Sequence, residues 1–455
     1  MASLFVACDD GGSAPLTFAQ TLDPATCADC HPDHYRQWSG SMHAYAAEDP
    51  VFRAMNARGQ RETGGALGDF CIQCHAPLAV RMGLTVDGLN MDDVPPALHG
   101  ITCAFCHQID AVEGTHNNPL RVAMDGVMRA GVAEPVSAPH RSAYSPLHDR
   151  EDLRSAALCG SCHDVVTPAG VHLERGYTEW LGSLFNSDDP KRKNTCNACH
   201  MHGRSGPIAD VEGVPVRRQH DHAMPGVDVA LTPFAEAEAQ RDGVQRELDT
   251  VLVAELCVLP RTGGAEIEVA LENVGAGHGV PSGAAHDRRF WVELRAFAGD
   301  EVIYESGVVG DGEPVAQLAD PDLWLMNDRA LTAQGATAHM FWDVASVLSD
   351  PLPAPPIGAS SLPTFGGQHV VRRYVAFDAS NPRTPDRVTM RVRARPIGLD
   401  VLDDLIDSGD LDPAVRAAMP TFDLEGTALE WTPDHADLRF TRLSGREALC
   451  VPIGF

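Results

Sequence analysis

The residues of this chain best suited to chemistry are cysteines and histidines that recur in one pattern. Five segments have the form Cys-x-x-Cys-His, whereas chance would produce only about 0.02 of them at a content of 13 Cys and 20 His. Two thiols three positions apart can add to the two vinyl groups of one porphyrin, and the imidazole that follows can then bind the iron. The pattern therefore predicts five covalently bound haem c groups.

The predicted attachment residues follow from the motif. The cysteines expected to form thioether bonds are Cys27, Cys30, Cys71, Cys74, Cys103, Cys106, Cys159, Cys162, Cys196 and Cys199. The histidines expected as proximal iron ligands are His31, His75, His107, His163 and His200.

Two other uses of paired cysteines fit this pattern poorly. A zinc ribbon needs four thiolates for each metal ion, and zinc gives no reason for a histidine after every second cysteine. A thioredoxin-like motif occurs once per domain, at the start of a helix that follows a strand. Five repeats, each with its own histidine, favour haem over both alternatives.

The fifteen histidines that remain could supply the sixth iron ligands. Bis-histidine coordination lacks the potential-raising effect of methionine, so we expect low-potential haems. Position in the sequence selects five distal candidates, which are His43, His148, His222, His116 and His278. The reserve candidates are His99, His140, His172, His202, His220 and His286. Each of these could instead be a surface or hydrogen-bonded histidine.

Charge and the first residues indicate partners and location. The formal net charge of −28 disfavours nucleic acid and favours redox partner proteins, either other cytochromes or a membrane oxidoreductase. Residues 1–22 resemble a shortened lipoprotein signal and tether, with small residues before an acylatable Cys8. We therefore expect an extracytoplasmic protein, in the periplasm or on the outer cell surface, that associates with a membrane through a lipid anchor at Cys8.

The distribution of the motifs predicts an α+β protein of several domains. Residues 23–230 hold every motif and predict a loop-rich, helical pentahaem domain whose interior is porphyrin rather than a conventional side-chain core. Residues 231–256 are rich in Ala, Glu and Arg and predict a connecting helix. Residues 257–455 alternate in polarity between turns and predict an antiparallel β-sandwich-like domain.

Individual elements can also be predicted. Helices are expected over 32–38, 41–58, 150–162, 177–185, 400–407 and 413–418, with Pro50 splitting the second of them. Strands are expected over 266–273, 290–297, 301–306, 370–377 and 388–394.

Cys257 and Cys450 could pair in an oxidising compartment, or remain two buried thiols. No Walker loop, dinucleotide fingerprint or nucleophile elbow is present.

The haem-motif region resembles multihaem cytochromes related to the tetrahaem carrier of ammonia oxidation. The segments that carry this resemblance are 27–43, 159–163, 179–183, 196–201, 275–283 and 288–291. The resemblance implies closely packed, largely bis-histidine haems and an electron-transfer role outside the cytoplasm. A fifth motif and a large additional domain depart from the tetrahaem pattern.

These observations predict a respiratory electron carrier that passes electrons along five haems. The alternative is a multihaem oxidoreductase that converts a small nitrogen or sulfur compound at a five-coordinate haem, which would need nearby acid–base groups. No catalytic residue is assigned, because no motif departs from Cys-x-x-Cys-His in a way that marks one haem as special. A structural subunit of a larger cytochrome assembly would differ from the carrier in its partners rather than in its chemistry.

Overall fold

The computed structural model describes residues 15–135, 139–359, 369–378 and 383–435. The chain divides into two compact units. Unit 1 comprises residues 1–178, 186–244 and 405–415, and unit 2 comprises residues 179–185, 245–404 and 416–455. Helix α12 (Ala237–Val251) lies where the chain passes from one unit to the other.

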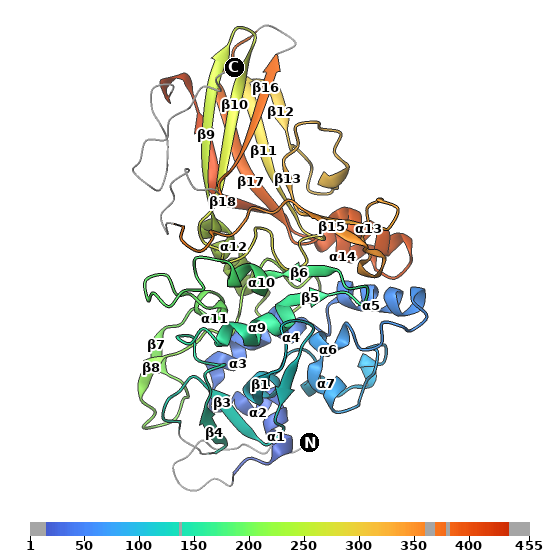
Figure 1. The fold of residues 1–455 in the computed structure, drawn as a ribbon, viewed down its shortest axis with the longest axis vertical. Coiled ribbons are helices and arrows are strands. Elements are labelled where there is room, and N and C mark those ends of the chain that lie inside the picture. Colours follow the sequence, from blue (N-terminus) through green and yellow to red (C-terminus); the bar gives the residue numbers. More distant parts are fainter. Residues whose placement is uncertain (1–14, 136–138, 360–368, 379–382, 436–455) are drawn as a thin grey trace. The chain divides into compact units, whose positions relative to one another are not determined.

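Unit 1 consists of short helices joined by loops and small paired strands (Figure 1). Its helices are α1 (Phe18–Leu22), α2 (Pro24–Cys27), α3 (Pro32–Ser39), α4 (Met42–Tyr45), α5 (Pro50–Glu62), α6 (Ile72–His75), α7 (Pro77–Arg81), α8 (Cys103–His107), α9 (Ser155–His163), α10 (Gly176–Leu181), whose last residues belong to unit 2, and α11 (Cys196–His200). Its strand pairs are β1 (Ile109–Val112) with β2 (Leu120–Val122), β3 (Val127–Ala130) with β4 (Arg141–Tyr144), β5 (Asp164–Val166) with β6 (His172–Arg175), and β7 (Ser205–Pro207) with β8 (Val216–Arg218).

Capping residues fix where the helices begin. The side chains of Thr102 and Thr195 accept hydrogen bonds from backbone N–H groups inside α8 and α11, and so satisfy donors that the first helical turn leaves free. Asp49 caps α5 in the same way, with Pro50 at the first helical position. The prediction that Pro50 separates two helices is therefore confirmed. Each of α6, α8, α9 and α11 ends on the histidine of its motif.

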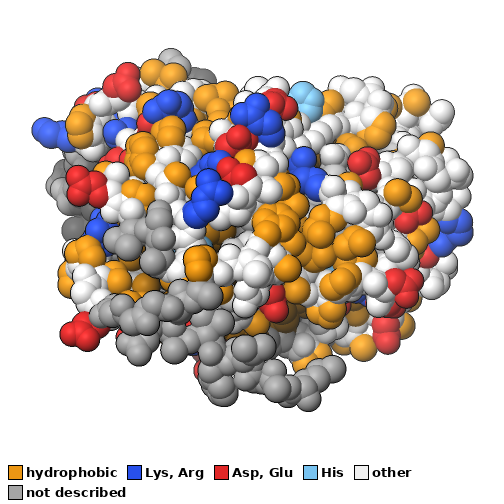
Figure 2. Space-filling view, turned by 90° about the horizontal axis from the view of Figure 1, so that it is seen from below, with side chains coloured by type: hydrophobic (Ala, Val, Ile, Leu, Met, Phe, Trp, Pro, Cys, Tyr) orange, Lys and Arg blue, Asp and Glu red, His pale blue; other side chains and the backbone are white. Residues whose placement is uncertain are grey.

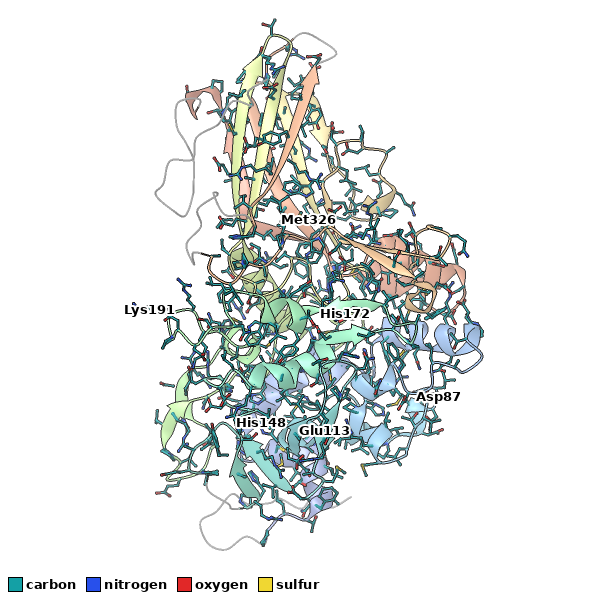
Figure 3. The ribbon with its side chains drawn as sticks, viewed as in Figure 1. Asp87, Glu113, His148, His172, Lys191 and Met326 are labelled. Atoms are coloured by element: carbon teal, nitrogen blue, oxygen red, sulfur yellow. The ribbon has the colours of Figure 1, made fainter. Side chains whose placement is uncertain are left out.

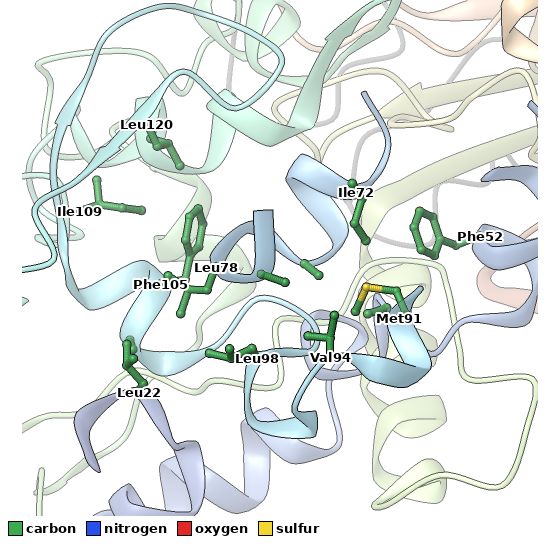
Figure 4. Packing of buried hydrophobic residues seen from close by; sticks show 14 residues of the cluster. Leu22, Phe52, Ile72, Leu78, Met91, Val94, Leu98, Phe105, Ile109 and Leu120 are labelled. Atoms are coloured by element: carbon green, nitrogen blue, oxygen red, sulfur yellow. The ribbon is translucent and has the colours of Figure 1, made fainter. Parts of the chain in front are cut away.

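Unit 1 also has a side-chain core, which corrects the prediction that porphyrins replace it. Fourteen buried residues between Leu22 and Leu120 form one cluster, and Ile72, Leu78 and Phe105 are among its least exposed members (Figure 4). Cysteines of three motifs pack against this cluster. The apolar residues of this cluster come from segments that are tens of residues apart in the sequence. Local spacing therefore gives no sign that they pack together.

Unit 2 is built from antiparallel sheets, as expected. Its three-stranded sheet has the order β16-β10-β9, formed by β16 (Val371–Asp378), β10 (Gly264–Asn273) and β9 (Leu252–Arg261). Its five-stranded sheet has the order β12-β11-β17-β18 with β13 on β11, formed by β12 (Glu301–Ser306), β11 (Arg289–Ala298), β17 (Arg387–Arg395), β18 (Phe422–Trp431) and β13 (Leu325–Met326). A strand pair β14 (Asp328–Leu331) and β15 (Ser346–Ser349) completes unit 2, and helices α13 (Leu399–Asp407) and α14 (Pro413–Ala418) each have residues in both units.

The predicted fold class is confirmed: a loop-rich helical region is followed by antiparallel sheets (Figure 1). All five predicted strands exist, with ends that differ by at most two residues. The predicted connecting helix is shorter than expected, because residues from Leu252 onward form β9. Strand β9 is almost wholly buried, so its apolar residues do not alternate with polar ones and gave no strand signal.

Buried ion pairs connect the strands of unit 2. The carboxylate of Glu293 on β11 accepts hydrogen bonds from Arg391 and Arg393 on β17. The Arg289 guanidinium donates to Asp400 at 2.5 Å, and both side chains are less than 10% exposed. A buried charge is costly unless it is paired, so the Glu293 pairs hold β11 against β17 and the Arg289 pair holds β11 against α13.

Candidate haem-attachment sites

Four of the proximal histidines share one hydrogen-bonding arrangement. Their Nδ1 atoms lie 2.6–2.9 Å from the backbone carbonyl oxygens of Ile208, Ala46, Arg129 and Pro225, for His31, His75, His107 and His200 respectively. An imidazole that donates Nδ1–H to a carbonyl has Nε2 available as a ligand, and iron-binding histidines are held in this way. These four side chains are therefore oriented to bind a metal through Nε2.

The cysteines of different motifs contact one another in pairs. Hydrogen bonds join the thiols of Cys27 and Cys103, of Cys74 and Cys162, and of Cys159 and Cys196. Cys106 is close enough to Cys159 that the two thiols interact electrostatically. The first motif therefore lies beside the third, the second beside the fourth, and the fourth beside the third and the fifth.

The oxidation state of the thiols matters for attachment. All motif cysteines other than Cys30 carry unoxidised thiols, whereas Cys30 is in a disulfide. A thioether bond to haem consumes the thiol, so attachment at the first motif requires that this disulfide is reduced. Burial raises the pKa of the Cys71 and Cys106 thiols to about 12, as expected for an apolar environment.

Three imidazole pairs have the separation that a shared iron atom requires. Imidazole nitrogens bind metal ions at about 2.0–2.1 Å, so two rings on either side of one iron have centroids about 6 Å apart. The centroids are 6.2 Å apart for His43 and His163, 6.2 Å for His31 and His140, and 6.3 Å for His107 and His222. His43 and His222 are two of the predicted distal candidates.

The third motif has a second histidine beside it. The ring of His148 (Figure 3) stacks 5.5 Å from that of His107, but its Nε2 lies 2.8 Å from the carbonyl oxygen of Cys106. Its Nδ1 is buried without a hydrogen-bond partner among the described residues. His222 instead has its Nδ1 at 2.9 Å from the His220 carbonyl, which leaves Nε2 available. The geometry of His222 resembles that of the proximal ligands more closely.

The other candidates lie elsewhere. His116 is on an exposed loop, with its Nδ1 3.1 Å from the Thr115 hydroxyl. His278 belongs to unit 2, with its Nδ1 2.9 Å from the carbonyl of Gly279. His99 contacts Glu48 through one ring nitrogen and the Val94 carbonyl through the other, so neither nitrogen is available for iron. His172, labelled in Figure 3, lies 3.3 Å from Asp164.

One histidine near these sites was absent from the candidates. His34 lies one helical turn after His31, with ring centroids 5.8 Å apart, and 4.7 Å from the ring of His222. The spacing i, i+3 on a helix that begins at Pro32 was the signal that could have identified it. His140, only a reserve candidate, approaches His31 from 109 residues away, and no local pattern reports such a contact.

The second motif differs from the others in its neighbouring ring. The phenyl ring of Phe52 stacks on the His75 imidazole at a centroid distance of 3.9 Å and an interplanar angle of 5°. Among the described residues, no imidazole is paired with His75 at the separation found for the three pairs above.

Burial keeps these imidazoles neutral. Burial, followed by repulsion from neighbouring histidines, lowers the pKa of His43 and His148 to about 4. A neutral imidazole is the form that binds metal ions.

Within the described part of the chain, no group of three or more His, Cys, Asp and Glu side chains of the kind that a zinc ribbon needs is found. No helix there has the length and apolar composition to cross a membrane. Cys8 and Cys450 lie outside the described residues, and Cys257 is disulfide-bonded.

Comparisons with known proteins agree with this chemistry. Residues 26–108, which include the first three motifs, match the family model described as cytochrome c554 and c-prime. Among curated proteins, none matches the sequence. A crystal structure of a penta-heme cytochrome c552 from Thermochromatium tepidum is similar in fold, with a TM-score of 0.59 and 19% identity, over 91% of this chain and 99% of that chain.

Together these findings support a multihaem c-type cytochrome. The family match supports haem c attachment within residues 26–108, and the structural likeness supports the fold. The family match lies within 26–108, so the segments between 159 and 291 that also carry the resemblance to the tetrahaem carrier are outside it. That closer relationship stays a prediction.

Proposed function

We propose that this chain holds five haem c groups, one at each motif, and transfers electrons in an extracytoplasmic respiratory pathway. The ten motif cysteines would form the thioether bonds, and the five motif histidines would be the proximal ligands. Haem iron supplies the one-electron redox chemistry when bound. The polypeptide supplies the spacing of the sites, their ligands and their burial.

The contacts between cysteines of different motifs carry this proposal. A thioether sulfur lies at the edge of its porphyrin, so sulfur contacts between motifs bring porphyrin edges together. The pairs Cys27–Cys103, Cys106–Cys159 and Cys159–Cys196 connect the first, third, fourth and fifth motifs, in that order. The pair Cys74–Cys162 joins the second motif to the fourth. A continuous series of neighbouring sites is what an electron carrier needs to pass electrons from one haem to the next.

The histidine pairs support low-spin iron at most sites. His43, His140 and His222 are proposed as the distal ligands of the fourth, first and third sites, because each faces the proximal ring at the required separation. Partners would be other cytochromes or a membrane oxidoreductase. A location in the periplasm or on the outer cell surface, with a lipid anchor at Cys8, is part of the same proposal.

Haem content and spin state test the proposal. The mass of the intact protein and its pyridine haemochrome absorbance should each give five haems per chain, and each Cys-to-Ala pair at one motif should remove one of them. Electron paramagnetic resonance of the oxidised protein should show predominantly low-spin haem. A colourless protein, or fewer than five thioether-linked haems, would contradict the proposal.

A second candidate function has one specific observation in its favour. Phe52, rather than an imidazole, is the ring beside His75, which suits the second site to a five-coordinate iron. An open iron position is what a reductase or oxidase of a small nitrogen or sulfur compound requires. A stoichiometric high-spin signal that disappears on addition of cyanide, and that is lost in a C71A/C74A variant, would favour this enzyme.

A further inference from the structure

A short loop after α7 exposes an unusual concentration of apolar side chains. We name residues 82–89 the apolar loop. Met82, Leu84, Val86 and Leu89 are 40%, 39%, 73% and 56% exposed, respectively. Exposed large apolar side chains grouped in this way mark interaction sites, whereas single ones need no explanation. Figure 2 shows one face of the protein, on which hydrophobic side chains gather among both acidic and basic ones.

Hydrogen bonds hold the apolar loop in one conformation. The buried Asn56 side chain donates to the carbonyl of Asp87 at 2.8 Å, and the Asn90 side chain donates to the carbonyl of Leu84 at 3.0 Å. The N–H of Gly88 donates to the Thr85 hydroxyl at 3.0 Å. The exposure of the apolar side chains is therefore a fixed feature of the native fold, and does not result from a loosely attached segment.

The loop packs directly on the second attachment motif. Gly88 has a φ of +74°, and a Cβ atom added there would lie 3.1 Å from Cβ of Ile72, the residue between Cys71 and Gln73. Only glycine allows this conformation together with this close approach. A protein bound to the apolar loop would consequently be adjacent to the second haem site.

The charges around the loop are mainly acidic. Asp87, Asp92 and Asp93 lie within or just beyond it, and Figure 3 places Asp87 at the periphery of unit 1. Arg53 neutralises part of this charge, because it pairs with Asp92 at 2.9 Å and also with Glu48. Arg81, at the start of the loop, has its guanidinium 5.9 Å from the Phe105 ring centroid. With a net charge of −28 on the whole chain, the surroundings of the loop are complementary to a basic surface.

We propose that the apolar loop is the docking surface for a small basic electron-carrier protein, whose apolar patch is ringed by lysine or arginine and contains its redox cofactor. This inference rests on the proposed electron-transfer function and names the class of partner and its place of contact. The acidic charge of this chain determines which kind of partner the apolar loop can bind. An anionic membrane surface and a second copy of this acidic chain would both be repelled, whereas a basic carrier would be attracted.

Binding and electron exchange with a basic probe protein test this inference. The haem-loaded full chain is titrated with oxidised mitochondrial-type cytochrome c by calorimetry, and electron exchange is followed by stopped flow at several salt concentrations. An L84S/V86S/L89S variant should weaken binding by about tenfold, because apolar side chains at the centre of an interface carry most of its affinity. A D87N/D92N/D93N variant should slow association about threefold at low salt, and the difference should vanish at high salt.

A matched control separates the loop from exposed apolar surface in general. Val216 on β8 is 72% exposed, so V216S removes a comparable side chain elsewhere on unit 1 and should leave binding unchanged. Wild-type affinity in the loop variants, or no salt dependence in the wild type, would overturn the inference. The inference would also be overturned if V216S weakened carrier binding as much as the loop variants do. It would likewise be overturned if the apolar loop were needed for binding to anionic vesicles or for dimerisation, and not for binding to the carrier.

The two proposals fail in different ways. A chain that lacks haem, or whose haems are not reduced by dithionite, contradicts the proposed function itself. A chain that is loaded and reducible, but whose loop variants exchange electrons with the probe as fast as the wild type, contradicts only the docking surface. Absorbance and circular dichroism of each variant establish that haem content and fold are unchanged.

Discussion

The two units of this protein solve the problem of a stable interior in different ways. Unit 1 has short helices, many half-buried histidines and thiols, and a side-chain core that reaches only part of the unit. Unit 2 has long strands in continuous register, and several of its buried charges, such as Arg289 with Asp400, form ion pairs. Buried polar groups without partners are costly, so unit 1 depends on a cofactor that unit 2 does not need.

The largest expected effect follows from this difference. We expect that the full chain produced without haem attachment loses protection from hydrogen exchange throughout α3, α8 and α11, because their buried imidazoles then have no metal. Amides of β10, β11 and β17 should stay protected by about 10³-fold or more, since the sheets of unit 2 are stabilised by their own hydrogen bonds. Hydrogen exchange followed by mass spectrometry measures both regions in one sample. Equal protection of the α3, α8 and α11 amides with and without haem would contradict the comparison.

A buried ion pair should give the largest effect of a single substitution. Arg289→Ala removes the guanidinium paired with the buried Asp400 carboxylate and leaves His339 3.4 Å from it, so it should lower the free energy of unfolding of unit 2 by about 3–5 kcal/mol. The control is Arg36→Ala, because Arg36 and Glu236 form a pair whose side chains are 54% and 38% exposed. That control should cost at most about 1 kcal/mol. Denaturant unfolding followed by circular dichroism measures both values.

A single asparagine should matter to the spacing of two attachment helices in unit 1. The buried Asn118 connects them, because its N–H donates to the Ser161 carbonyl on α9 at 2.7 Å and its side chain donates to Gln73 on α6. Its φ of +54° disfavours a residue with a Cβ atom unless it is Asn or Asp. Asn118→Ala should cost about 1–3 kcal/mol, and Asn118→Gly less, because glycine keeps the backbone conformation. Thermal unfolding monitored by haem absorbance compares the two variants, and equal losses would show that the backbone conformation contributes nothing.

The smallest expected effect depends on pH. Burial, and then repulsion by Glu268, raises the pKa of Glu255 from 4.5 to about 7. A carboxyl group whose pKa is raised by folding contributes its full stability below pH 4.5, and this contribution is lost as the pH rises through 7. Glu255→Gln should therefore raise the melting temperature of unit 2 by about 2–4 °C at pH 8, and not at pH 4.5. Glu305→Gln on the exposed side of β12 is the control. A gain for Glu255→Gln that is independent of pH would contradict the stated cause.

Sequence reasoning succeeded where the structural cause is local. Four of the five Cys-x-x-Cys-His motifs end short helices because the thiols and the imidazole must lie on one turn of chain, and Pro50 starts a helix because its ring suits the first position. Alternation of polarity located β10, which has one face toward the core of unit 2. Strand β9 was missed because it is buried on both faces and so does not alternate.

Long-range contacts account for most of what could not be predicted. His140 approaches His31 across more than a hundred residues, and the choice between His148 and His222 beside His107 depends on which ring nitrogen meets a carbonyl. The side-chain core of unit 1 has the same origin, since residues from Leu22 to Leu120 converge on it. Such contacts depend on the packing of several loops, and no spacing in the sequence encodes them.

The carbonyl acceptors of the proximal imidazoles impose an order on folding during synthesis. His75, His107 and His200 find their acceptors within 29, 22 and 25 residues, so each ring can be oriented soon after its motif emerges. The acceptor of His31 is Ile208, which lies 177 residues later. The first motif to be synthesised is thus the last of these four to acquire its final ring orientation.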